Sequence, residues 1–481
     1  MIILGTNSIK DTGFDVANSL RFNSGSSDYL TKGSLGTGST TKATFSVWIK
    51  KSKLSPSQDI YSLYLDNDNQ LRLRLRDNGA ITIYISLSNS TVVEKRSTLL
   101  LGDFSAWYHV VLVTDLTESA AENKYKIYIN NVKITSYAVN TNTSATSYDN
   151  IVAGGGSYVM HLGSNGQHGD NFYSGYMAEV VHIDGQALNP TSFGEFDEDS
   201  GIWKPIDVSG LTFGTNGFYL DFEDSSALGN DKAGSNNFTV GNLTAIDQST
   251  DTCTNNFATL NPLDVSLPST FALSEGNLDG LMSGISSNAY ARAYSNIQVA
   301  SGKWYAECKI TEEGDSGIIG VSARSGISYV DVSGTNYDWL GINAHDYRYY
   351  HDGTKMNNNS SSSYGTTWDG GDIIGIALDM DNLAVYFSLN GTFQASGDPT
   401  SGSSRTNAAF NLTAVASTPN GAYKFGIGTQ GGTDVQGQWN FGSPPYAISS
   451  GNTDGNGFGN FEYAVPSGYF ALCTKNLAEY G

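Results

Sequence analysis

Cysteines and cationic residues are scarce in this chain, and both shortages exclude classes of protein. Cys253, Cys308 and Cys473 are too few and too widely spaced for a disulfide framework or a C-x-x-C metal site. The odd number leaves at least one thiol free, as expected of a chain made in a reducing cytosol. Lys and Arg number 26 against 47 Asp and Glu, for a formal net charge of -21. Because nucleic-acid affinity depends on clustered cations, we expect no nucleic-acid partner.

Long apolar runs are missing as well. No stretch approaches the roughly 20 apolar residues that a membrane-spanning helix needs. The start, Met1-Ile2-Ile3-Leu4, lacks the basic residues and the apolar length of a signal peptide. We therefore expect no membrane insertion and no standard secretion.

Turn-forming and strand-forming residues are abundant instead. The chain has 55 Gly and 10 Pro, with many Ser, Thr, Asn and Tyr, which is typical of short strands joined by tight loops. A length of 481 residues exceeds the roughly 250 to 300 residues over which a single core grows. The composition predicts an all-β protein with two main domains.

Period-two alternation is clearest in Leu71-Arg72-Leu73-Arg74-Leu75-Arg76. This spacing places the leucines on one face of a strand and the arginines on the other. We therefore expect the leucine face to pack in the core and the arginine face to be exposed to solvent. Asx-rich turns precede the strand at residues 66–69 and follow it at Asp77-Asn78-Gly79. We expect successive antiparallel meander strands.

The first part of the chain carries a set of strand motifs in a familiar order. They are Leu20-Arg21-Phe22-Asn23, Phe45-Ser46-Val47-Trp48-Ile49, Trp107-Tyr108-His109-Val110, Lys126-Ile127-Tyr128-Ile129-Asn130 and Gly175-Tyr176-Met177-Ala178-Glu179-Val180. Their order resembles that of the laminin-G-like, concanavalin A-like jelly roll. The resemblance implies a β-sandwich over residues 19–188. Residues 1–18 precede the first recognisable strand and lack a core pattern of their own, so we expect them to form an N-terminal docking arm.

Residues 189–270 have more turn signals than strand signals and are interpreted as an ordered connector. Their aromatic residues are too frequent for a disordered linker. One clear strand, Gly217-Phe218-Tyr219-Leu220-Asp221-Phe222, could complete the first sandwich or bridge to the second.

The remainder, residues 271–481, resembles a SPRY domain. The resemblance rests on Gly302-Lys303-Trp304-Tyr305-Ala306-Glu307, Ile318-Ile319-Gly320-Val321, Gly371-Asp372-Ile373-Ile374-Gly375, Leu378-Asp379 and Val385-Tyr386-Phe387-Ser388-Leu389-Asn390-Gly391. The predicted fold class is therefore all-β, with two antiparallel β-sandwich (jelly-roll) domains in tandem.

The pairing of these two modules resembles structural proteins of marine bacteriophages. Such a resemblance implies synthesis in the host cytoplasm and display on the virion surface, as a tail fibre, an appendage or a head decoration. It implies other virion proteins as partners, and a host-surface polysaccharide as a second kind of partner. We expect a homo-oligomer.

The aromatic residues Trp339, Tyr347, Tyr349 and Tyr350 are the candidate ligand-binding residues, in a stretch that also contains Tyr337. Flat rings with polar tips suit sugar faces and protein partners alike. Alternation along Tyr347-Arg348-Tyr349-Tyr350 sends Tyr347 and Tyr349 to one face and Tyr350 to the other. Part of the set must therefore pack in the core. Core packing is the alternative to ligand binding for each of these residues.

Asp66, Asp68 and Asn69 are a candidate calcium site, since their hard oxygen atoms suit this ion and laminin-G-like folds often hold calcium at a rim. No other cofactor is expected. The competing interpretation is an Asx-rich hairpin turn. The histidines form no H-E-x-x-H motif, and we expect His109 to pack on the strand after Trp107.

Glu195, Asp197 and Asp199 are the sharpest enzymatic candidates, because retaining glycanases use paired carboxylates about 5 to 5.5 Å apart. The flanking Gly194 and Ser200-Gly201 favour a charged surface turn instead, so no catalytic residue is predicted. The leading hypothesis is a non-enzymatic virion protein that attaches to host-surface glycan or to neighbouring virion proteins. The alternatives are a decoration protein that binds only the head shell and a polysaccharide depolymerase.

Overall fold

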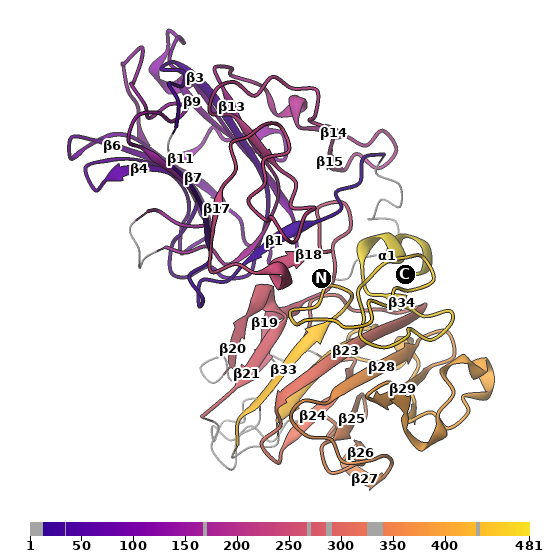
Figure 1. Cartoon of the computed structure of the whole chain (residues 1–481). Coiled ribbons are helices and arrows are strands. Elements are labelled where there is room, and N and C mark those ends of the chain that lie inside the picture. The colour runs from indigo at the N-terminus through magenta and orange to yellow at the C-terminus, as the bar shows by residue number, and fades with distance from the viewer. Residues whose placement is uncertain are drawn as a thin grey trace. The chain divides into compact units, whose positions relative to one another are not determined.

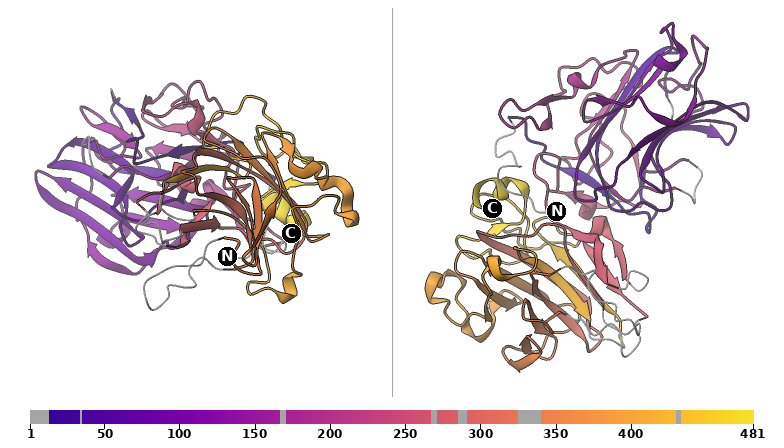
Figure 2. Two further views of the ribbon diagram at one scale, coloured as in Figure 1. Left: turned by 90° about the horizontal axis from the view of Figure 1, so that it is seen from below. Right: turned by 180° about the vertical axis from the view of Figure 1, so that it is seen from behind.

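Strands form nearly all of the regular structure in the computed structural model, which describes residues 13–33, 35–166, 171–266, 271–284, 291–324, 340–429 and 433–481. The chain divides into two compact units, one spanning Thr12–Thr254 and the other containing Asn255–Gly481 (Figure 1). Each unit consists of antiparallel sheets stacked face to face, as the two views in Figure 2 also show. The prediction of two β-sandwich domains in tandem is confirmed.

The first unit contains two large sheets. Sheet A has the order β10 (Val132–Lys133), β9 (Tyr125–Ile129), β8 (Tyr108–Asp115), β3 (Lys42–Lys51), β13 (Gly175–Asp184), β1 (Ser19–Phe22) and β18 (Gln248–Ser249), with β16 (Phe218–Leu220) on β13. Sheet B has the order β11 (Tyr137–Thr141), β7 (Ser90–Leu100), β6 (Ala80–Leu87), β5 (Asn69–Leu75), β4 (Gln58–Asp66), β12 (Val159–Leu162), β2 (Tyr29–Lys32) and β17 (Thr239–Gly241). A separate ribbon pairs β14 (Gly194–Phe196) with β15 (Trp203–Pro205).

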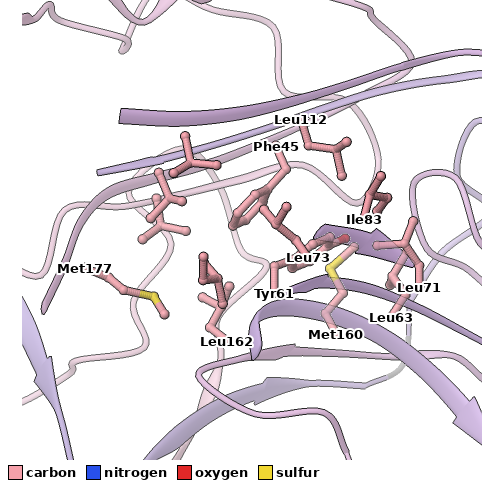
Figure 3. Packing of buried hydrophobic residues seen from close by; sticks show 14 of the residues in the cluster. Phe45, Tyr61, Leu63, Leu71, Leu73, Ile83, Leu112, Met160, Leu162 and Met177 are labelled. Atoms are coloured by element: carbon pink, nitrogen blue, oxygen red, sulfur yellow. The ribbon is translucent and has the colours of Figure 1, made fainter. Parts of the chain in front are cut away.

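Alternating residues of the two sheets fill the core between them. Phe45 and Leu112 from sheet A face Leu71, Leu73 and other side chains from sheet B (Figure 3). The rings of Phe45 and Tyr61 stack across the interface with centroids 4.3 Å apart. The expected split of β5 is confirmed, because its leucines are buried and its arginines lie on the opposite face.

The residues expected to form a connector, 189–270, instead divide between the two units. Their strand β16 pairs with β13, β17 pairs with β2 and β18 pairs with β1, so residues 189–254 complete the first sandwich. Residues from 255 onward belong to the second unit. Turn signals in the sequence could not reveal this, because short edge strands take their partners from distant parts of the chain.

The expected docking arm lies partly outside the described residues, which begin at residue 13. Its described end packs on the first unit. Val16 is buried against Trp48 and Trp203, and its backbone N–H donates to Thr254 Oγ1 at 3.0 Å. Residues 13–18 therefore contribute to the first sandwich, and any docking role would concern the residues before them.

The second unit also contains two large sheets. Sheet C has the order β19 (Leu260–Ser266), β22 (Ala291–Ser295), β32 (Lys424–Thr429), β24 (Gly317–Ser322), β25 (Asp346–Tyr350), β26 (Thr354–Asn357) and β27 (Ser360–Ser363). Sheet D has the order β20 (Phe271–Ser274), β21 (Asp279–Met282), β33 (Val435–Asn440), β23 (Lys303–Glu312), β28 (Ile373–Asp379), β29 (Ala384–Leu389) and β30 (Thr392–Phe393). Strands β31 (Phe410–Asn411) and β34 (Phe470–Ala471) pair with β29 and β23.

Indole rings anchor the core of this second sandwich. Trp304 and Trp439 from sheet D are fully buried together with Phe425 and Ile427 from sheet C. The motif Gly302-Lys303-Trp304, on which the SPRY resemblance partly rested, thus supplies a core residue at the start of β23. Helix α1 (Thr474–Tyr480) is short, and the described residues include no helix of the length and apolarity that a membrane span requires.

Candidate functional site

The tyrosines predicted to bind a ligand lie mostly inside the second sandwich. Tyr347 and Tyr349 on β25 are buried in its core, where Tyr349 packs edge-on against Tyr364 at 5.4 Å. Tyr350 points to the opposite face, as the alternation predicted, and is half-buried beside Ile318. Trp339 and Tyr337 lie outside the described residues. A ligand-facing role for Tyr347 and Tyr349 is therefore replaced by core packing, because both rings lie on the face of β25 that packs in the core of the sandwich.

The acidic hairpin at residues 66–69 is built as an Asx turn. Asp66 Oδ1 accepts hydrogen bonds from the Asp68 backbone N–H at 2.9 Å and from Asn69 Nδ2 at 2.8 Å. These bonds and the pairing of Asp66 with Asn69 close the turn between β4 and β5. The hairpin interpretation accounts for all three residues, and calcium binding there stays a prediction.

The carboxylates considered for catalysis lie at an exposed hairpin. Lys204 Nζ is 3.4 Å from Glu195 Oε1 and 3.6 Å from Asp197 Oδ2. Hydrogen bonds from Ser200 hold the pKa of Asp197 below its usual range. A glycosidase acid needs a raised pKa, so Asp197 is unsuited to that role. The structure places these residues in a charged turn at the surface, which is the interpretation that the sequence favoured.

His109 is a structural residue of the first unit, packed on β8 as expected. Trp203 Nε1 donates to its Nδ1 at 3.0 Å, so its Nε2–H donates to Ser46 Oγ at 2.7 Å. Its ring stacks on Trp48 at 4.8 Å. Burial lowers the pKa of His109 to about 3, which keeps the imidazole neutral. Both ring nitrogens are engaged, and neither is free for a metal.

One group of described residues could hold a divalent cation. The ligand atoms of Glu313, Asp315 and His351 all lie within 4.8 Å of one another, where the turn between β23 and β24 meets the end of β25. Glu313 already accepts a hydrogen bond from the Asp315 backbone N–H. The sequence did not single out this group. His351 lies 36 residues after Asp315, and the pairing of β24 with β25 brings the two segments together.

A polar platform on the outer face of sheet B is the stronger candidate site. Strand pairing joins Glu94 on β7, Tyr84 on β6 and Arg72 on β5 side by side in one row. A second row joins Arg96, Thr82 and Arg74. Side chains of directly paired residues share one face, so both rows point away from the core. We define the platform as Arg72, Arg74, Tyr84, Glu94 and Arg96.

Ion pairs fix the arginines of the platform. The Asp59 side chain is fully buried and forms ion pairs with both Arg72 and Arg74. Arg74 Nε lies 3.1 Å from Asp59 Oδ1. Arg96 is 2.6 Å from Glu94 Oε1. Guanidinium groups held in this way present planar donors at a set orientation, which suits hydroxyl and carboxylate groups of a ligand.

A loop borders the platform on the side of β4 and β12. Ser62 Oγ donates to the backbone carbonyl of Ser164 at 3.0 Å, and Gly166 lies directly over Tyr64 and His161. A Cβ at Gly166 would come within 2.7 Å of the Tyr64 ring, so only glycine allows this approach. The loop covers β4 and β12. On β5 and β6, Thr82 is buried, while Arg72, Arg74 and Tyr84 are partly exposed.

Arginines gather at this face of an otherwise acidic chain. Four of the nine arginines in the sequence lie there: Arg72, Arg74, Arg76 and Arg96. Burial and the charges of Arg96 and Arg74 lower the pKa of Arg76, which shows how close the cations lie. The sequence revealed the arginine face of β5. It did not reveal Tyr84 and Arg96 beside it, because their neighbours are set by cross-strand register.

A buried carboxylate on sheet A is a second unusual group in this unit. Glu179 lies at a bulge of β13, where its φ is 49° and the register with β3 shifts. Its side chain is buried, and Tyr219 Oη donates to it at 2.8 Å. Burial, with the nearby charges of Asp221, Glu223 and Asp207, raises the pKa of Glu179 to about 8. The carboxyl group is therefore protonated at neutral pH.

Replacing Glu179 with Gln should make the stability of the protein less sensitive to a rise in pH from about 4.5 to about 8. The folded state binds a proton at Glu179 that the unfolded state releases above its ordinary pKa of 4.5, so wild-type stability falls as pH rises from about 4.5 to about 8. Glu179→Gln lacks this loss. Its unfolding free energy minus that of wild type should rise by about 3 kcal/mol between about pH 5 and pH 8. Urea titrations at both pH values measure the difference, and a constant difference would contradict the assignment.

The architecture is that of two stacked-sheet domains, and a family model matches a part of each. Residues 24–192 match the model of the concanavalin A-like lectin/glucanases superfamily, and residues 303–443 match the SPRY domain model. The chain thus carries a concanavalin A-like domain and a SPRY domain. No curated protein matches it.

Several solved structures are similar to parts of the chain. The SPRY domain of human HERC1 is 15% identical, with a TM-score of 0.27, over 37% of this chain and 96% of that chain. A putative carbohydrate binding protein from Bacteroides ovatus is 17% identical, with a TM-score of 0.33, over 48% of this chain and 61% of that chain. Domain 4 of AbnA, an arabinanase from Geobacillus stearothermophilus solved with arabinotriose, is 19% identical, with a TM-score of 0.25, over 32% of this chain and 65% of that chain.

Proposed function

We propose that this protein is a non-enzymatic attachment protein of a virion surface, of the tail fibre or appendage type, that binds a host-surface glycan through the platform on sheet B. The observation that carries the proposal is the row of the partly exposed Glu94, Tyr84 and Arg72 on the outer face of sheet B. A tyrosine ring stacks on the apolar face of a sugar, while the flanking carboxylate and guanidinium groups bond its hydroxyls.

The charge of the platform favours an acidic glycan. Arg72, Arg74, Arg76 and Arg96 outnumber the acidic side chains nearest to them, Asp59, Glu94 and Asp77. The rest of the chain is strongly acidic and would repel a polyanion, so this face is where a uronate or sulfate group would bind. The binding role of concanavalin A-like domains supports the proposal, as does the tandem order of the two modules.

Tyr84→Ala should weaken glycan binding strongly, with little effect on folding. The Tyr84 ring is half-buried, and its hydroxyl group accepts one long hydrogen bond, 3.3 Å, from Thr91 Oγ1. Loss of the stacking surface should weaken binding on a glycan array, or to host cells, by at least about tenfold. Tyr128→Ala, which removes a half-buried tyrosine from the outer face of sheet A, is the matched control.

Three outcomes would count against this proposal. Equal losses in Tyr84→Ala and Tyr128→Ala would mean that the platform is not the site. Absence of saturable attachment to host cells, together with binding to the head shell, would favour the decoration protein. Release of reducing ends from a bound polysaccharide would overturn the non-enzymatic assignment.

A further inference from the structure

A polar cavity in the second unit lies apart from every residue considered so far. Its volume is about 220 Å³, and its lining includes Asn261, Asp264, Gln298, Asn420 and Lys424. These residues come from β19, from the segment after β22, from the loop before β32 and from the start of β32. The cavity therefore belongs to one edge of sheet C.

A bulge in the edge strand builds one wall of the cavity. The pairing of β19 with β22 loses register between Leu260 and Val265. The intervening residues leave the ladder, and two of them, Asn261 and Asp264, line the cavity. Bulges at sheet edges redirect side chains in this way and are common beside binding sites.

An ion pair forms the charged part of the lining. Lys424 Nζ pairs with the Asp264 carboxylate, and the two side chains are 4% and 14% exposed. The Tyr294 ring lies 4.2 Å from the same Nζ. The pair is neutral overall, so the cavity offers no net charge to an ionic ligand. An ammonium group has three N–H donors, which leaves Lys424 able to bond a ligand oxygen as well.

Two amide side chains complete the lining with hydrogen-bonding capacity to spare. Gln298 and Asn420 are half-buried, and within the described part of the chain neither side chain makes a hydrogen bond. Each amide offers two donors and a carbonyl acceptor. A ligand that bonded both amides would satisfy groups that the fold itself does not use.

We propose that this cavity binds a neutral, hydroxyl-rich ring of the size of one monosaccharide. The lining residues named above offer no apolar side chain, which argues against an aliphatic or aromatic ligand. The neutral ion pair argues against a phosphate or carboxylate ligand. The volume is below the roughly 300 to 1,000 Å³ of sites for drug-sized molecules, so one sugar ring fits and an oligosaccharide does not. This site is independent of the platform on sheet B.

Saturation-transfer difference NMR on the full chain tests the proposal with D-glucose, D-galactose, D-mannose and N-acetyl-D-glucosamine, each titrated separately. At least one should bind saturably, while D-glucuronate should not bind at this site. Gln298→Ala/Asn420→Ala should weaken the binding by at least about tenfold, since two ligand hydrogen bonds are lost. Asn411→Ala, an exposed amide on β31 away from the cavity, should leave binding unchanged.

Thermal unfolding of each variant is measured in parallel, and Asn420→Trp, which fills the cavity with a bulky ring, provides a second variant. Saturable binding lost in both cavity variants at unchanged thermal stability would support the site. Signals that do not saturate, or that persist in both variants, would overturn it. Binding that is lost in Tyr84→Ala but kept in the cavity variants would assign the sugar to the platform and also overturn it.

Discussion

A fragment that ends at residue 188 should not fold, whereas a fragment of residues 13–254 should unfold in one cooperative transition. Residue 188 is where the turn-rich segment begins, and a boundary there matches the sequence patterns. In the structure, ending the chain at residue 188 removes β16, β17 and β18, which pair with β13, β2 and β1. The edges of both sheets would lose their neighbours.

The lost apolar burial is large enough to decide the outcome. Six core side chains of the first sandwich lie after residue 188: Phe218, Leu220, Phe222, Leu228, Phe238 and Leu243. Each contributes about 2 kcal/mol on burial, so together they contribute on the order of 12 kcal/mol. Whole domains are stable by about 5 to 15 kcal/mol.

Near-UV circular dichroism and urea titration of both fragments measure the effect. The shorter fragment should show no tertiary signal and no sigmoidal transition, with residues 13–254 as the positive control. Cooperative unfolding of the shorter fragment at a comparable urea midpoint would show that residues 189–254 are dispensable for the first sandwich.

Asp251→Asn should destabilise the first unit by about 3 to 5 kcal/mol. Lys50 Nζ lies 2.6 Å from Asp251 Oδ2, and both side chains are 1% exposed. Trp107 Nε1 donates to the other carboxylate oxygen at 3.1 Å. The substitution keeps the shape of the side chain and removes the carboxylate charge that lies 2.6 Å from the buried ammonium group of Lys50. Breaking a buried pair on one side carries this large penalty.

A double-mutant cycle separates the ion pair from side-chain packing. Lys50→Met removes the second charge, and Asn at 251 keeps an acceptor for the Trp107 indole, so Lys50→Met/Asp251→Asn should be more stable than Asp251→Asn alone. Glu118→Gln is the matched control, because its pair with Lys126 at 2.7 Å is partly exposed and should contribute less than about 1 kcal/mol. Equal effects of Asp251→Asn and Glu118→Gln on the urea midpoint would disprove the role assigned to the buried pair.

Local pattern predicted much of the fold. The leucines and arginines of β5 separate to opposite faces, and the Asx turns on either side of this strand connect it to β4 and β6. Alternation also separated Tyr350 from Tyr347 and Tyr349. These features depend on residues within a few positions of one another, where the period of two fixes which side chains share a face.

The candidate sites could not be predicted in the same way. Tyr84 and Arg72 come from neighbouring strands, but their alignment in one row depends on the register of β5 with β6. Asp264 and Lys424 are 160 residues apart and meet through β22, which lies between their strands. Register and strand order are set by long-range pairing, and no local pattern in the sequence contains them.

By itself, the sequence determined the strand content, the two sandwich domains and the acidic, disulfide-free character of the chain, because these follow from composition and from a repeat of two residues. Only the tertiary structure decided that residues 189–254 finish the first sandwich, that Tyr347 and Tyr349 are core residues, and that Tyr84 and Arg96 lie beside the arginines of β5 on one outer face. The physical reason is that burial and side-chain neighbourhood depend on which distant strands pair and which face of each sheet another layer covers.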